Sequence, residues 1–381
     1  MRLRRNALPH VLRRLVKVAA ESGLLFIFSV ATCVCAYAHH SFATHYLVDQ
    51  PMEITGTVSE LSLRSPHSFL MVDVRSEQGV VERWEVEAHA VPLMRRLGIE
   101  ADTIQLGDEI TVRGPGPRRT DKKLMFAAVL ILADGTQFTL LDSLLSDLNR
   151  GLTEDSSDTL PADAGILERI GGRWGRSSGG GSGTQLGDSP LPLNSAGLSA
   201  RAAYDPRNTP AMDCISPGLP SLLYAPYLYE IQINGQEAIL HHEYQTVFRS
   251  VDLGGGTVGP DSRPQFGYRT GRVDGNVLVV ESRGFPAEAA GLASDWDPNG
   301  LGANVPSSGQ KRLIEKYTVS EDGQRLILDY TVEDPAYLSE PYSSRIEWRR
   351  LVADAPIYDF ECDVSIATRS TLNAPAKESS N

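Results

Sequence analysis

The chain has 381 residues, with 36 basic and 48 acidic side chains and a formal net charge of −12 at pH 7. Such an acidic chain does not offer the basic surface that nucleic acids and anionic membranes require, so we expect no nucleic-acid partner. With 41% hydrophobic residues, the length is sufficient for two domains with real cores.

The first 38 residues have the composition of an export signal. Residues 1–17 are basic, residues 23–36 form an apolar run too short to span a bilayer comfortably, and Ala36-Tyr37-Ala38 has the small residues that signal peptidase reads. We predict cleavage after Ala38, a periplasmic or secreted mature chain that begins at His39, and no stable membrane insertion after cleavage. The alternatives are an uncleaved anchor and a lipid-modified cysteine.

Residues 39–140 are predicted to form an OB-like domain, a small five-stranded β-barrel. A helix over Ala90–Leu97 separates three strand-like runs from two more, which is the element order of an OB-fold. A shift in the apolar alternation predicts a bulge near Glu60, and Asp134-Gly135 predicts a hairpin turn into Thr136–Leu140. The five predicted strands are Met52–Leu63, Phe69–Arg75, Val80–Glu87, Gly107–Gly114 and Leu124–Leu132.

Residues 141–205 are rich in Gly, Ser and Pro, a composition typical of a flexible linker. Residues 206–363 are predicted to form an antiparallel, lipocalin-like barrel, because eight strands with short connections can close an up-and-down barrel around side chains or one small ligand. Residues 364–381 are interpreted as a disordered tail. The fold class is therefore mainly β. The eight predicted strands are Tyr227–Ile233, Glu237–Glu243, Thr246–Leu253, Gly267–Arg272, Asn276–Ser282, Lys311–Val319, Arg325–Val332 and Ser344–Leu351.

Only Cys214 and Cys362 remain after the predicted cleavage. Two cysteines in an oxidising compartment are typical of one disulfide. Cys214 precedes the first predicted barrel strand and Cys362 follows the last. We expect the two to be close, because the first and last strands of such a barrel pair with each other. The alternative is a free nucleophilic cysteine.

Four histidines lie near the start of the predicted mature chain, at His39, His40, His45 and His67. A histidine at a free N-terminus offers its α-amine and Nδ1 as a chelate, and one more imidazole completes a three-nitrogen site that suits Cu(II). His39 gains that α-amine only after cleavage at Ala38. We therefore predict a copper site formed by these histidines; the alternative is tolerated polar residues on a frayed chain end.

His241-His242 looks like a metal-binding pair, but neighbouring residues of a regular strand point to opposite faces of the sheet. In the register that the Asn234-Gly235 turn implies, His242 shares a face with Leu240 and Ala238. We predict that His242 faces the core or a ligand and that His241 is exposed.

Several short motifs resemble a bacterial family of exported domains of unknown function. They are Ala38-His-His-Ser-Phe42, Gly56-Thr-Val58, Ser65-Pro-His67 and Gly107-Asp108. Members of that family typically begin Ala-His-His-Ser-Phe after the signal and carry Asn-Pro-His where this chain has Ser-Pro-His. The second half is similar to a recurrent partner domain of exported proteins, through Thr209–Cys214, Gly271–Val280 and Val332–Pro335. The resemblance implies a periplasmic location and a two-domain layout, and it implies no activity.

Three hypotheses for the function follow from these patterns. The first is metal binding, with copper as the expected cofactor, and the second is a module that binds a small or apolar ligand in the barrel. The third is an oxidative or hydrolytic enzyme, for which the carboxylates considered are Asp295, Asp297 and Glu315. No spacing identifies a nucleophile or an acid–base pair, so the enzyme is the least favoured of the three.

Overall fold

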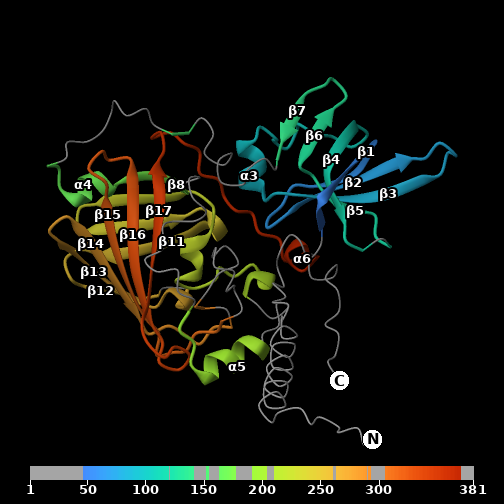
Figure 1. Cartoon of the computed structure of the whole chain (residues 1–381). Coiled ribbons are helices and arrows are strands. Elements are labelled where there is room, and N and C mark those ends of the chain that lie inside the picture. The colour runs from blue at the N-terminus through green and yellow to red at the C-terminus, as the bar shows by residue number, and fades with distance from the viewer. Residues whose placement is uncertain are drawn as a thin grey trace, which may run out of the picture. The chain divides into compact units, whose positions relative to one another are not determined.

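The computed structural model describes residues 46–119, 121–140, 152–153, 163–176, 191–203, 210–260, 263–289, 291–292 and 305–369. The predicted signal, His39, His40, His45 and most of the Gly/Ser-rich stretch lie outside these residues. Two β-sheets organise the described chain, as Figure 1 shows.

The first sheet has the strand pairing of an OB-fold, as predicted. Its order is β5-β3-β2-β1-β4-β6-β7, and helix α3 (Val91–Arg96) separates β3 from β4. The register shifts between Val58 and Glu60 of β1, which confirms the bulge. The strands are β1 (Tyr46–Ser62), β2 (Ser68–Arg75), β3 (Val81–Ala88), β4 (Glu109–Pro117), β5 (Leu124–Phe126), β6 (Val129–Leu132) and β7 (Gln137–Thr139).

The predicted strand Leu124–Leu132 is divided into β5 and β6, because each part pairs with a different neighbouring strand. Its first part, β5, pairs parallel to β3, and its second part, β6, pairs antiparallel to β4. The chain crosses β4 at Gly114, where an added Cβ would lie 2.0 Å from the Phe126 carbonyl oxygen. Only glycine permits this approach, and the crossing curls the sheet around its core.

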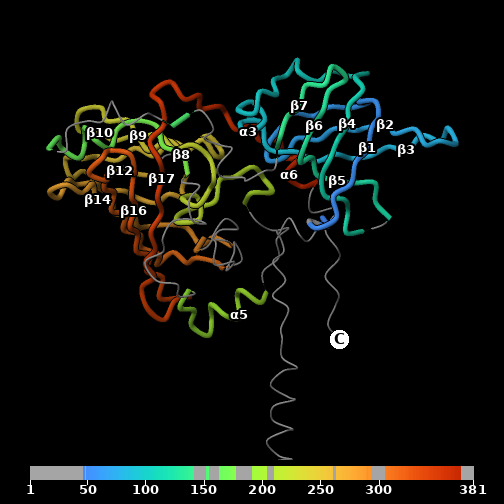
Figure 2. The backbone as a smooth tube through the Cα atoms, turned by 45° about the horizontal axis from the view of Figure 1, so that its top comes forward, coloured from blue at the N-terminus to red at the C-terminus, as the bar shows by residue number. Residues whose placement is uncertain are grey.

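All eight strands predicted for the second domain are present, and they form part of a ten-stranded antiparallel sheet. The order is β11-β10-β9-β8-β17-β16-β15-β14-β13-β12. In Figure 1, β12 to β17 lie side by side, and Figure 2 shows how the traces of β8–β10 and β12–β17 wrap around the core of this barrel. The strands are β8 (Gly172–Arg176), β9 (Tyr229–Asn234), β10 (Glu237–His242), β11 (Val247–Asp252), β12 (Thr257–Val258), β13 (Tyr268–Asp274), β14 (Val277–Arg283), β15 (Arg312–Val319), β16 (Arg325–Glu333) and β17 (Tyr342–Arg350).

Strand β8 lies inside the stretch that composition predicts as a linker. It pairs with β9 on one side and with β17 on the other, so the prediction that the first and last barrel strands pair directly is wrong. Trp174 of β8 is fully buried, and the preceding helix α4 (Ile166–Ile170) contributes its two isoleucines to the barrel core. These apolar residues stabilise the segment, although its glycines resemble linker composition.

The barrel comes close to closure where β11 meets β12 and β13. Gly271 of β13 faces β11 there, and an added Cβ would lie 2.4 Å from Cγ1 of Val251. Arg269 spans the same gap, because its guanidinium donates to the carbonyl oxygens of Ser250, Gly259 and Gly267.

Short helices complete the described chain. They are α5 (Ser195–Ala203), α6 (Val364–Ala367), and the 3₁₀ helices η4 (Pro210–Asp213), η5 (Ser221–Tyr224), η6 (Tyr244–Thr246) and η7 (Pro264–Phe266). Helix α6 lies in the region predicted as a disordered tail, and the Asp363 side chain caps it by accepting from the Ser365 amide at 2.9 Å. No helix in the described part of the chain is both long and apolar enough to cross a membrane.

Candidate functional site

His67 and Glu87 form the centre of the candidate site in the first domain. His67 lies in the turn between β1 and β2, and Glu87 lies near the end of β3. The His67 Nδ1 is 2.9 Å from the Glu87 Oε1, and the Tyr46 hydroxyl donates a hydrogen bond to the Oε2 of the same carboxylate. The Glu87 carboxylate therefore contacts both His67 and Tyr46.

Burial and the Glu87 carboxylate act together on the two groups that contact this carboxylate. Burial is the largest effect on His67 and lowers its pKa, but the Glu87 carboxylate and its contact with the ring raise the pKa above its usual value. Burial and the same carboxylate raise the pKa of the Tyr46 hydroxyl, so this group stays protonated and donates. The Nδ1 of His67 is buried and makes no hydrogen bond of regular geometry, so its contact with Glu87 is an ion pair, while 37% of the side chain remains exposed.

His89 lies beside this cluster but has a different role. Its Nε2 is 2.7 Å from the Leu140 carbonyl oxygen, which can only accept, so Nε2 carries the proton. Its ring meets that of Phe126 edge to face. Burial lowers the pKa of His89 to about 4, and nearby His67 contributes in the same direction. His89 is therefore a neutral, structural histidine at pH 7.

Of the four predicted copper ligands, only His67 is among the described residues. Within the described ranges, no group of three or more His, Cys, Asp or Glu side chains is placed to hold a metal ion. Sequence reasoning missed Tyr46 and Glu87. The strand alternation places Glu85 and Glu87 on one face of β3, but nothing in it pairs Glu87 with a turn 20 residues earlier.

The arrangement is one that metal sites use repeatedly. A ligating histidine commonly donates its second ring nitrogen to a carboxylate, which fixes the orientation of the ring and increases the basicity of the ligand. In this chain Glu87 stands at Nδ1 of His67, which leaves Nε2 as the nitrogen for a metal.

The second domain places His242 inside the barrel and His241 on its other face. His242 stacks on Tyr229 with ring centroids 4.4 Å apart, and its buried Nε2 has no hydrogen-bond partner. His241 is 8% exposed, so its predicted exposure is wrong. Its cross-strand neighbours Phe248 and Glu230 cover it, since the Phe248 ring stacks on it at 4.0 Å.

Glu315, one of the carboxylates considered for catalysis, is part of a buried ion pair within the barrel. Its two oxygens accept from Nη1 and Nη2 of Arg249 at 3.1 and 2.5 Å, and Oε1 also accepts from the Tyr317 hydroxyl. Arg249 and Glu315 are both fully buried. Because Arg249 neutralises this carboxylate, Glu315 has the setting of a structural residue. Asp295 and Asp297 lie outside the described residues.

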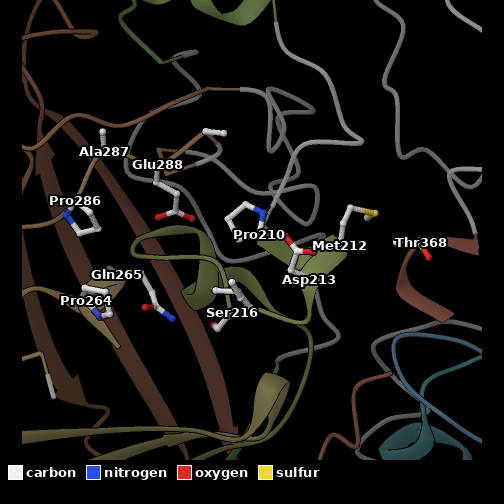
Figure 3. A pocket seen from close by; sticks show the side chains of 12 residues that line it. Pro210, Met212, Asp213, Ser216, Pro264, Gln265, Pro286, Ala287, Glu288 and Thr368 are labelled. Carbon is white, nitrogen blue, oxygen red and sulfur yellow. The ribbon is translucent and has the colours of Figure 1, made fainter. Parts of the chain in front are cut away.

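Figure 3 shows a pocket of about 720 Å³ bounded by η4, η7 and the stretch after β14. Three prolines, Met212 and Ile215 form the apolar part of its walls, and Asp213, Ser216 and Gln265 are among the polar residues. The Glu288 carboxylate at its edge accepts from the Gly218 amide at 2.9 Å. The pocket can accommodate a small molecule, and its described walls show no acid–base pair.

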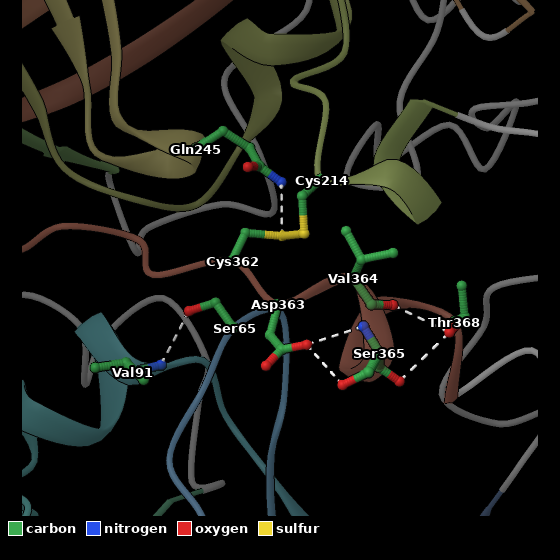
Figure 4. The surroundings of a disulfide bond; sticks show 9 residues. All are labelled: Ser65, Val91, Cys214, Gln245, Cys362, Asp363, Val364, Ser365 and Thr368. Atoms are coloured by element: carbon green, nitrogen blue, oxygen red, sulfur yellow. Dashed lines mark hydrogen bonds between the residues drawn. A yellow bond between two sulfur atoms is a disulfide. The ribbon is translucent and has the colours of Figure 1, made fainter.

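Cys214 and Cys362 are joined in a disulfide whose α-carbons are 5.7 Å apart. Figure 4 shows the bond between the segment that joins β8 to β9 and the segment after β17, with the Gln245 amide donating toward the Cys362 sulfur. The predicted pairing therefore holds, although β8 lies between the strands that were expected to bring the two cysteines together.

Comparison with known proteins matches the first part of the chain to a family. Residues 27–124 match a family of unknown function, DUF6152. This range contains His39, His40, His45, His67 and Glu87. No curated protein matches the chain. Among solved structures, the mitochondrial single-stranded DNA-binding protein Rim1 of S. cerevisiae is similar at 13% identity and a TM-score of 0.18, over 23% of this chain and 97% of that one.

Proposed function

We propose that the first domain is an exported copper-binding module whose Cu(II) site joins the mature N-terminus to His67. The observation that supports this most directly is the shared carboxylate of Glu87. It holds His67 through Nδ1 and Tyr46 through its hydroxyl, and Tyr46 directly follows His45 in the chain.

The short distance along the chain supports the same site. His39 precedes Tyr46 by seven residues, and a chain of seven residues spans at most about 25 Å. Since Tyr46 is anchored at the carboxylate beside His67, the length of the intervening chain allows His39, His40 or His45 to supply ligands in this proposal. In this proposal Glu87 is a positioning residue rather than a ligand.

The chemistry of the donor set selects the metal. The α-amine and Nδ1 of an N-terminal histidine form a chelate, and an imidazole from His67 completes three nitrogen ligands. Nitrogen ligands of this number suit Cu(II), which also stands highest among divalent metals in the Irving–Williams order. Binding weakens as the pH falls, because every one of these nitrogens must be deprotonated.

The test is a Cu(II) titration of the exported protein, after N-terminal sequencing has established that it begins at His39. We expect one Cu(II) per chain, with nitrogen hyperfine structure in the electron paramagnetic resonance spectrum. One extra alanine before His39 moves the α-amine out of the chelate, and His67→Ala removes an imidazole. Each change should weaken binding by at least about tenfold.

The matched control is His241→Ala, which removes a histidine of the second domain and should leave the affinity unchanged. An affinity that the extra alanine does not alter would refute the N-terminal chelate. A protein that binds no Cu(II) at all would refute the proposal.

A second candidate function is the binding of a small apolar molecule by the second domain, and the pocket in Figure 3 favours it. Apolar walls with a few polar groups suit such a ligand. Native mass spectrometry of the exported protein tests this idea, because a ligand retained from the cell adds its mass to the chain.

A further inference from the structure

The segment that follows the barrel, residues 361–369, runs alongside the turn that carries His67. We call it the C-terminal strap. The Ser65 amide donates to the Glu361 carbonyl oxygen at 3.3 Å, and the Asp363 amide donates to the Ser65 carbonyl oxygen at 2.9 Å. Figure 4 shows Ser65 next to Cys362 and Asp363. Ser65 is fully buried and lies two residues before His67.

The far end of the C-terminal strap holds the strand that carries Glu87. The Arg369 guanidinium donates to the Glu85 carboxylate at 3.1 Å and lies over the Phe69 ring at 4.6 Å. Glu85 shares a face of β3 with Glu87, and Phe69 of β2 is the cross-strand partner of Glu87. The strap therefore contacts the immediate neighbours of both residues of the candidate site.

The disulfide fixes where the C-terminal strap lies. Cys362 is the residue of the strap that bridges to Ser65, and its sulfur is bound to Cys214, which lies between β8 and β9. Apart from the disulfide, the backbone contacts at Ser65 are two hydrogen bonds, each with a net contribution of only about 1 kcal/mol. Side chains add to these bonds, since Glu361 pairs with Arg95 at 2.9 Å, and the covalent bond at Cys362 restrains the position of the strap further.

We propose that the Cys214–Cys362 disulfide controls the position of His67, the described ligand of the proposed copper site, so that the oxidised protein holds this turn in place and the reduced protein releases it. The inference rests on the proposed function. Reduction breaks the sulfur–sulfur bond and adds two electrons and two protons, which give two thiols. A dithiol reductant supplies both and is itself oxidised to a disulfide. Loss of the bond lets the strap leave Ser65, and the turn that carries His67 becomes mobile.

The test compares the exported wild-type protein with a variant that lacks the bond, Cys214→Ser/Cys362→Ser. Serines replace chemical reduction here because dithiols themselves bind copper. In the variant we expect the Ser65 amide to exchange with solvent about tenfold faster, the imidazole signals of His67 to shift in nuclear magnetic resonance spectra, and the affinity for Cu(II) to fall about tenfold.

Two further variants guard against a general loss of structure. Arg369→Gln keeps the disulfide and loosens only the far end of the C-terminal strap, so it should shift the His67 signals in a folded protein. Leu326→Ala destabilises the barrel core without touching the strap and should leave these signals unchanged.

The outcomes separate this inference from the proposed function. Unchanged Ser65 exchange and unchanged His67 signals in the serine variant would overturn the inference, whatever the copper affinity and whatever Arg369→Gln does. If wild-type protein binds no Cu(II), the copper proposal fails, and the exchange and His67 signals still decide whether the disulfide controls the turn.

Discussion

The buried ion pair between Arg249 and Glu315 provides a quantitative test of whether the barrel interior is a packed core or a solvent-filled site. The Glu315 carboxylate accepts three hydrogen bonds, from Nη1 and Nη2 of Arg249 and from the Tyr317 hydroxyl, and neither charged side chain is exposed. Replacing Glu315 with Gln keeps the size of the side chain but leaves a buried guanidinium without a counter-charge.

Removing one partner of a buried pair costs about 3–5 kcal/mol of unfolding free energy, whereas replacing both with apolar residues is often neutral or stabilising. We therefore expect Glu315→Gln to destabilise the protein by about 3–5 kcal/mol. The double variant Arg249→Met/Glu315→Leu should be less destabilised than Glu315→Gln, because no charge remains buried.

The assay is urea-induced unfolding of the disulfide-bonded protein, followed by tryptophan fluorescence, to which the buried Trp174 and Trp348 of the barrel contribute. The matched control is Glu281→Gln, which breaks the ion pair with Arg312. In this pair the Arg312 side chain is 40% exposed and the Glu281 side chain 24% exposed. The substitution should cost less than about 1 kcal/mol, since exposed ion pairs contribute little. A cost for Glu315→Gln as small as this would show that solvent or a ligand reaches the pair, and it would refute the assignment of a packed interior.

Two more predictions concern the barrel. Gly271→Val should destabilise the barrel by about 1–3 kcal/mol through overpacking, because the added Cβ would lie 2.4 Å from Cγ1 of Val251. The measurement is thermal unfolding, with Val273→Ala at an exposed site as the control. Equal unfolding temperatures for the two variants would contradict this prediction. Burial, and secondarily Arg249, lower the pKa of His242 well below its usual value, so below about pH 6.5 the unfolded chain binds a proton that the folded chain does not. The free energy of unfolding should then fall by up to about 1.4 kcal/mol per pH unit because of this residue. Between pH 7 and 5, His242→Phe should lose less of its unfolding free energy than the wild-type protein. An identical pH dependence of the two proteins would exclude His242 as the source.

Local signals were sufficient for most of the fold. Each predicted hairpin around Asn234-Gly235, Asp274-Gly275 and Asp322-Gly323 is present, because the turn residues and the alternation of the flanking strands are encoded within about ten residues. The bulge in β1 could be read from the sequence for the same reason, since an extra residue reverses the alternation within one strand.

Features that depend on residues far apart in the chain could be recognised only in the tertiary structure. Strand β8 has the glycine-rich composition of a linker, and the burial of Trp174 between strands from the rest of the barrel makes it a strand. The exposure of His241 depends on its neighbours across the sheet, which alternation along one strand does not specify.

In the candidate site, too, local features could be predicted and contacts between distant residues could not. The turn at His67 could be predicted from the sequence, because proline acts locally, and the histidines near the predicted mature N-terminus are visible there too. That Glu87 joins His67 to Tyr46, and that the disulfide-bonded strap reaches Ser65, was decided by tertiary structure alone. The physical reason is that these contacts join residues 20, 41 and about 300 positions apart, and only the packing of the folded chain brings such residues together.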